Sequence, residues 1–77
     1  MAESNVVGIQ VHGPALRSHR LAADLTLERL ASDAGMPQVR LQALEASGWV
    51  PVENREVRGL IEVLDCDFEA LFTLVER

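Results

Sequence analysis

The chain has 77 residues, with 12 Asp and Glu against 7 Arg and Lys, which gives a formal net charge of −5. A chain of this length forms one domain that buries only roughly 60% of its unfolded-chain surface. No apolar run is long enough for a membrane span, the first ten residues lack the pattern of a secretory signal, and the single Cys66 excludes an internal disulfide, which favours a reducing, cytoplasmic compartment.

Residues 1–13 are expected to form an N-terminal arm. The segment "VVGIQV" at 6–11 is β-branched and apolar, and "HGP" ends it. One interpretation is a disordered arm. The other is a short strand, which would be an exposed edge in an otherwise helical chain and would pair most simply with a second copy of itself, as a dimerisation strand.

Two helices are predicted next. Pro14 suits the first turn of a helix over about 14–23. Thr26 then caps a second helix, with Leu25 and Leu30 spaced as a hydrophobic staple. Gly35 is expected to end this helix in the left-handed conformation.

Three more helices are predicted after the glycine. Pro37 restarts the chain as a third helix, in which Leu41 and Leu44 face inward. Residues 46–51, "ASGWVP", have the composition of a loop. A fourth helix begins near Asn54 and shows apolar residues at helical spacing. Asp67 can cap a last helix, which gives an all-α domain; its inward positions are Phe68, Leu71, Phe72 and Val75.

Several short motifs then coincide in register. "LRSHR" opens the first helix, "LT" precedes the second, "AG" and Met36 mark the turn, "LE" ends the third, and "LDCDFEALF" covers the last two. Over about residues 15–72 this spacing resembles the lambda-repressor-like helix-turn-helix domains of the Cro and Xre type. The resemblance implies a compact five-helix domain at 14–77. It also implies a sequence-specific transcriptional regulator, of the phage or plasmid repressor or antitoxin-like type, that binds double-stranded operator DNA as a homodimer.

The resemblance also assigns roles to residues. In this family the second helix crosses the phosphate backbone and the third lies in the major groove. A Gln amide there can pair with an adenine edge. The implied base contacts are Gln38, Val39, Gln42 and Ala43; the implied backbone contacts are Arg17, Thr26, Arg29 and Arg40; and Arg20 with Glu45 forms an ion pair between the first and third helices.

Each of these roles has a plainer alternative. The Gln side chains can be solvated helix-surface residues, and Arg40 can form a surface pair with Glu28 or Asp33. Leu27 stands where the family usually has a Gln, and the loop after the third helix carries no Lys or Arg. These departures favour a second hypothesis, a protein–protein interaction module that does not bind DNA strongly; its candidate partner contacts are Trp49 and Leu21.

No other chemistry is indicated. The sequence contains no Ser/His/Asp or Cys/His set in a plausible arrangement, no phosphate-binding Gly loop and no metal-ligand spacing. We therefore expect no enzyme activity, no metal and no cofactor. His19 is expected to be a surface or half-buried residue, and Cys66 to pack as a small hydrophobe.

Overall fold

Five helices account for most of the chain in the computed structural model, which describes residues 6–76. Pro14 lies in the first turn of α1, Thr26 accepts a hydrogen bond from the Arg29 backbone N–H at the start of α2, and Gly35 ends α2 with φ 73°. These are the predicted start and stop signals. The helices are α1 (Gly13–Ala22), α2 (Leu27–Ala34), α3 (Gln38–Ala46), α4 (Asn54–Leu64) and α5 (Phe68–Leu71).

A three-stranded antiparallel sheet accompanies the helices, so the expectation of an all-α domain is only partly met. The strands are β1 (Val6–His12), β2 (Trp49–Val52) and β3 (Phe72–Glu76), in the order β2-β1-β3. The segment expected to be disordered, or to pair with a second copy, is thus a central strand with partners in its own chain. Residues 1–5 of the predicted arm lie outside the described residues.

Two further expectations are wrong in the sheet. The segment containing Trp49 was predicted as loop but pairs with β1, with Pro51 opposite Gln10. Proline is tolerated there because β2 is an edge strand, where a missing N–H costs no ladder bond. The last helix is also shorter than predicted: α5 ends at Leu71, and Val75 belongs to β3.

The core lies where the helices meet the sheet. Leu16 of α1, Leu30 of α2 and Leu60 of α4 are fully buried, as is Val11 of β1. Full burial of a Leu side chain contributes roughly 1.5–3 kcal/mol. The remaining buried apolar residues are Ala31, Met36, Leu41, Leu44, Val57, Leu71 and Phe72.

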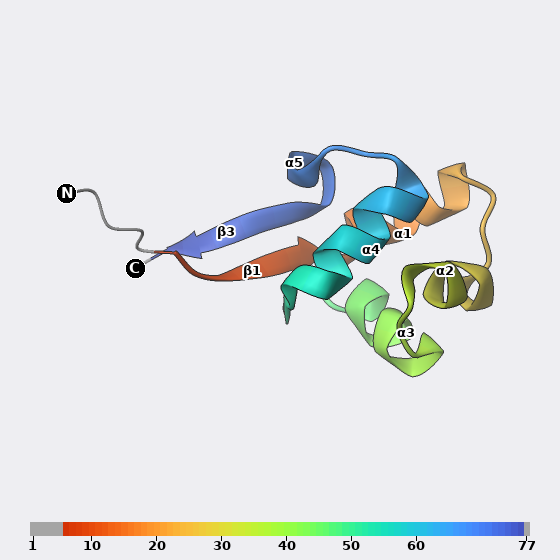
Figure 1. Cartoon of the computed structure of the whole chain (residues 1–77), viewed down its shortest axis with the longest axis horizontal. Helices are drawn as coiled ribbons and strands as arrows, with labels where there is room; N and C mark the ends of the chain where they lie inside the picture. The colour runs from red at the N-terminus through yellow and green to blue at the C-terminus, as the bar shows by residue number, and fades with distance from the viewer. Residues whose placement is uncertain (1–5, 77) are drawn as a thin grey trace.

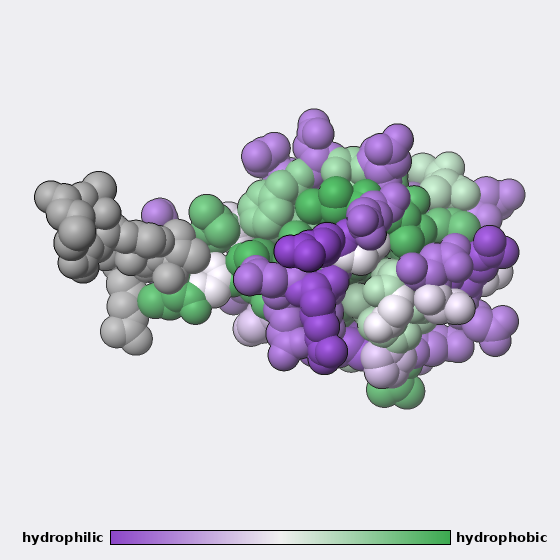
Figure 2. Space-filling view, viewed as in Figure 1, coloured by the Kyte–Doolittle hydropathy of each residue, from purple (hydrophilic) through white to green (hydrophobic). Residues whose placement is uncertain are grey.

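The molecule has an elongated shape, 44 × 21 × 19 Å. The helices form a body at one end, and β1 and β3 run side by side away from it (Figure 1). Strand β2 pairs only with Ile9–His12, so the outer part of β1 is paired with β3 alone. Figure 2 shows hydrophilic residues over much of the helical body and apolar atoms where the strands leave it. We call this projecting part, Val6–Gly8 with Leu74–Glu76, the ribbon; Leu74 is at its inner end, opposite Ile9, the first residue that also pairs with β2.

Candidate nucleic-acid interface

The α2–α3 turn brings two helices together at a fixed angle. Gly35 takes the left-handed conformation that a side chain would disfavour, and its position as C-cap ends α2. The Met36 N–H then donates to the Ala31 carbonyl at 2.9 Å. Because Leu30, Ala31 and Met36 are buried, the turn is part of the core and both helices are held rigidly.

The outward face of α3 carries the four residues implied as base contacts. Leu41 and Leu44 are fully buried, so they fix which side of the helix faces the core. The opposite side is solvated, and Val39 is 78% exposed. Val39 is the only large apolar side chain that α3 exposes, and a single exposed apolar residue is common on protein surfaces. The other residues exposed on this face are Gln38, Gln42 and Ala43.

Arg20 and Glu45 form the expected ion pair between α1 and α3. The Arg20 Nε donates to Glu45 Oε2 at 2.8 Å and Nη2 donates to Oε1 at 3.1 Å. A third bond, from Nη1 to the Leu25 carbonyl at 2.9 Å, ties in the chain just before α2. The side chains are only 10% and 5% exposed. This pair therefore links α1, the approach to α2, and the C-terminal half of α3.

Arg40 makes a different set of contacts from those expected. Its Nε donates to Glu56 Oε2 at 2.9 Å and its Nη2 to Glu56 Oε1 at 3.2 Å, while Nη2 also donates to the Pro51 carbonyl at 2.9 Å. The surface partners considered for it, Glu28 and Asp33, are not the ones it binds. Its hydrogen bond to Glu56 raises the pKa of Arg40 and lowers the pKa of the Glu56 carboxyl.

Glu56 is the residue that sequence reasoning missed at this site. It is held by α4, where Glu53 and Glu56 form a capping box: the Glu53 N–H donates to Glu56 Oε1 at 2.9 Å. The capping-box motif usually has Ser or Thr at the N-cap, so the Glu at position 53 gives only half of the sequence signal, the Glu at N3. No local pattern connects Glu56 with Arg40, which lies 16 residues earlier, before β2.

The other expected backbone contacts lie on α1 and α2. Thr26 Oγ1 accepts from the Arg29 N–H at 3.0 Å, so this hydroxyl already caps α2. The Arg29 side chain pairs with Asp33 one turn later, which raises its pKa. Arg17 is exposed and, with Leu27 and Gln42, lines a shallow depression of about 240 Å³ between α1, α2 and α3.

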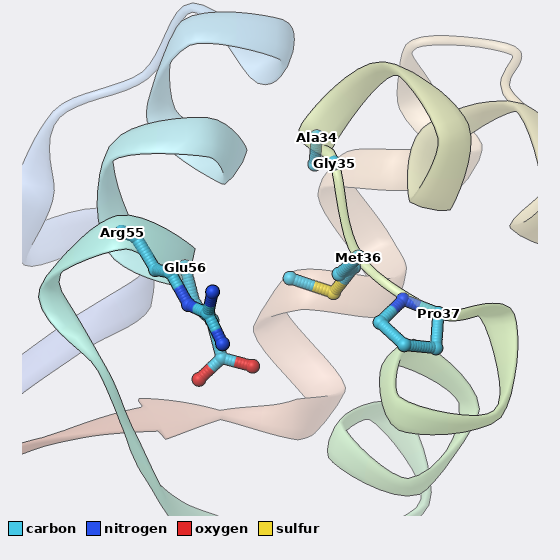
Figure 3. A pocket seen from close by; sticks show the side chains of 6 residues that line it. All are labelled: Ala34, Gly35, Met36, Pro37, Arg55 and Glu56. Carbon is cyan, nitrogen blue, oxygen red and sulfur yellow. The ribbon is translucent and has the colours of Figure 1, made fainter.

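A second cavity, of about 350 Å³, lies between the α2–α3 turn and the start of α4. Figure 3 shows Arg55 and Glu56 on one side of it and Met36 and Pro37 on the other. Arg55 pairs with Glu53 at 2.9 Å, and Glu56 is bonded to Arg40. The charges around this cavity are therefore balanced, and it offers no net positive charge to a phosphate.

The residues considered as partner contacts are exposed at separate places. Trp49 is 51% exposed on β2, and its ring lies 4.8 Å from the ring of His12. Leu21 is 56% exposed near the end of α1. His19 is half-buried, with Nδ1 3.0 Å from the Ala15 carbonyl.

Cys66 is half-buried beside the core. Burial, and then the neighbouring Asp67 and Asp65, raise the pKa of its thiol, which disfavours the reactive thiolate.

Within residues 6–76 no group of three or more His, Cys, Asp and Glu could hold a metal ion. None of the helices in the same range is long and apolar enough to cross a bilayer.

The fold is similar to the structures of two known regulators. The structure is similar to the DNA complex of SinR, a master regulator for biofilm formation, with a TM-score of 0.66, 20% identity, and coverage of 75% of this chain and 95% of that one. It is similar to the transcriptional regulator VanUg, with a TM-score of 0.65, 17% identity, and full coverage of both chains. No protein-family model and no curated protein matches the sequence.

These similarities define the class of fold. The chain has the fold of the lambda-repressor-like helix-turn-helix domains, as the sequence motifs predicted. The alignment with VanUg spans the whole of both chains, so it includes the segments that form the strands here.

Proposed function

We propose that this chain is a sequence-specific DNA-binding transcriptional regulator, of the small repressor or antitoxin-like type, that reads the major groove with α3. The observation that carries the proposal is the outward face of α3. Gln38, Val39 and Gln42 are exposed there, while buried Leu41 and Leu44 fix the helix from behind. A helix presented in this way fits the width of the major groove of B-DNA.

The charge distribution is compatible with this role despite the net charge. Residues 1–52 carry four Arg against five Asp and Glu, a sum of −1, whereas residues 53–77 carry three Arg against seven, a sum of −4. Most of the excess acidity is thus outside the helix-turn-helix segment. The few cations near α3 support only weak, salt-sensitive binding by a single copy.

The proposed regulator acts as a homodimer on a two-fold operator, because two copies double the number of phosphate contacts. The ribbon is the surface we propose for the second copy. Val7 and Leu74 on it are 58% and 49% exposed, and the outer part of β1 has one unpaired edge within the described chain. The sequence has no Asp, Glu, Lys or Arg from residue 4 to residue 16. Two acidic copies therefore repel each other least along β1.

Selection from a random pool of duplexes at low salt tests the proposed DNA binding. We expect one sequence class to be enriched. Gln38→Ala and Gln42→Ala should each relax the preference at one base pair, by about 1–3 kcal/mol. Thr73→Ala, which removes a polar group from exposed β3, is the control and should select the same duplexes. If the wild-type chain enriches no sequence, the proposal fails.

Half-exposed Trp49 favours a second candidate function, a protein–protein interaction module. Trp residues concentrate interface energy when a partner covers them. A nuclease-treated pulldown with the wild-type chain and with Trp49→Ala distinguishes the two. A stoichiometric partner that is lost only in the variant, together with no enriched duplex, supports the interaction module.

A further inference from the structure

Arg40 of α3 is bonded on the inner side of the helix, toward α4 and β2. Two of its nitrogens bind the two carboxylate oxygens of Glu56, and Nη2 also binds the Pro51 carbonyl. Planar two-point pairing of this kind is the strong and geometrically specific form of an ion pair. The contact therefore fixes an angle as well as a distance.

Glu56 cannot readily follow a moving Arg40. Its side chain is only 11% exposed, and its Oε1 also accepts the Glu53 N–H in the capping box that begins α4. The acceptor is thus anchored to the first turn of α4. Arg40 is tied to a rigid point of the body.

Arg40 and Glu45 are the only charged residues of α3, whose sequence is QVRLQALEA. Glu45 is bonded to Arg20 of α1, and Arg40 is bonded to Glu56 of α4. Helix α3 is therefore held to α1 through Glu45 and to α4 through Arg40. Both charges are neutralised by these partners, so the face formed by Gln38, Val39 and Gln42 carries no formal charge.

We propose that Arg40 is a positioning residue, which fixes the angle of α3 through Glu56, and not a phosphate contact. This inference rests on the proposed function, because the angle of α3 matters where that helix reads DNA. An uncharged reading face also lets an acidic chain approach a duplex without a local carboxylate opposing the phosphates.

Because Glu56 is negatively charged, a positioning role and simple charge repulsion predict opposite changes in DNA affinity when Glu56 is neutralised. Neutralising a carboxylate ordinarily strengthens binding to a polyanion, because repulsion falls. If Glu56 instead holds Arg40 in place, Glu56→Gln should weaken binding to the selected duplex about tenfold, which corresponds to ~1.4 kcal/mol. Glu62→Gln, an exposed neutralisation on the same helix, is the matched control and should bind as well as the wild type or slightly better.

Salt dependence separates a positioning role from a phosphate contact. Loss of one phosphate contact lowers the slope of log K against log salt by about 1. Arg40→Gln should weaken binding about tenfold, like Glu56→Gln, and keep the wild-type slope. The exchanged variant, Arg40→Glu with Glu56→Arg, should recover part of the affinity. Glu56→Gln binding as tightly as the wild type, or Arg40→Gln reducing the slope by about 1, would overturn the proposal.

A measurement without DNA keeps this inference distinct from the proposed function. Amide hydrogen exchange of the free protein should be faster in α3 for both Arg40→Gln and Glu56→Gln, with wild-type rates for Glu62→Gln. If the wild type binds no duplex, the proposed function fails. Independently of that result, wild-type rates of amide hydrogen exchange in α3 for Arg40→Gln and Glu56→Gln would overturn the positioning role of Arg40.

Discussion

Arg20 and Glu45 form a nearly buried ion pair, with side chains 10% and 5% exposed. Loss of one partner leaves the other charge without its partner in a low-dielectric site. We expect Arg20→Leu to lower the free energy of unfolding by about 3 kcal/mol, whereas Arg20→Leu with Glu45→Leu should be close to the wild type. Urea unfolding followed by circular dichroism measures both. Arg17→Leu, an exposed change on the same helix, should stay within about 0.5 kcal/mol.

A single Arg20→Leu variant as stable as Arg17→Leu would contradict this prediction. The single and double variants differ because a buried ion pair contributes little net stability, whereas a single buried charge without its partner is strongly destabilising. The pair was expected from the sequence through the family resemblance. The partner of Arg40 was not, because Glu56 lies 16 residues later in the sequence, in the first turn of α4 and beyond β2.

At the scale of elements, helices were easier to predict than strands. The start of α2 at Thr26, its end at Gly35 and the start of α4 near Asn54 are signalled by neighbouring residues. Strand β3 has no such local signal, since its partners in β1 lie more than 60 residues earlier in the sequence, from Phe72 opposite Val11 to Glu76 opposite Val6. The apolar residues Phe68, Leu71, Phe72 and Val75 are also spaced as in a helix, and this led to the wrong interpretation of the last element.

Gly59 in α4 allows a prediction about the contact between α2 and α4. A Gly→Ala change inside an open helix stabilises it by about 1 kcal/mol. Here a Cβ at position 59 would lie 2.5 Å from the Ala34 carbonyl oxygen, which is backbone and cannot move without shifting α2. We therefore expect Gly59→Ala to destabilise the fold, by about 1–3 kcal/mol.

Thermal unfolding of Gly59→Ala, beside Arg58→Ala as an exposed control on the same helix, measures this effect. A variant more stable than the wild type would show that α2 and α4 are not packed as closely as the structure has them. Since Ala34 immediately precedes the turn at Gly35, a shift of α2 would also alter the approach to α3. Gly59→Ala should therefore bind the selected duplex less tightly.

At the scale of the whole molecule, the body and the ribbon have different properties. The helices surround the core, whereas the ribbon is a two-stranded segment with exposed Val7 and Leu74 (Figure 1). A two-stranded ribbon is marginally stable by itself in water, and an open strand edge invites pairing. Antiparallel pairing of β1 with β1 of a second copy is symmetric about a two-fold axis perpendicular to the sheet. Both α3 helices would then lie on the same side of the sheet.

Sedimentation velocity without DNA, over a series of protein concentrations, tests association through the ribbon. We expect the wild type to dimerise, and Val7→Glu to raise the dissociation constant by about tenfold or more, because the two-fold axis brings the new carboxylates together. Val39→Glu places the same charge on α3, outside the ribbon, and should dimerise like the wild type. Circular dichroism checks that each variant is folded.

The same variants connect association with DNA binding. A dimer engages two half-sites about one helical turn apart and makes twice the phosphate contacts of a single copy. Monomeric Val7→Glu should therefore show about half the salt slope of the wild type and protect a single half-site. Val39→Glu should show the reverse pattern, with normal association and weakened binding, since it adds a negative charge to the helix proposed to read the duplex. If Val7→Glu dimerises at the same protein concentration as the wild type, the ribbon is not the interface. The DNA-binding role of α3 would then be judged by the Gln38 and Gln42 variants alone.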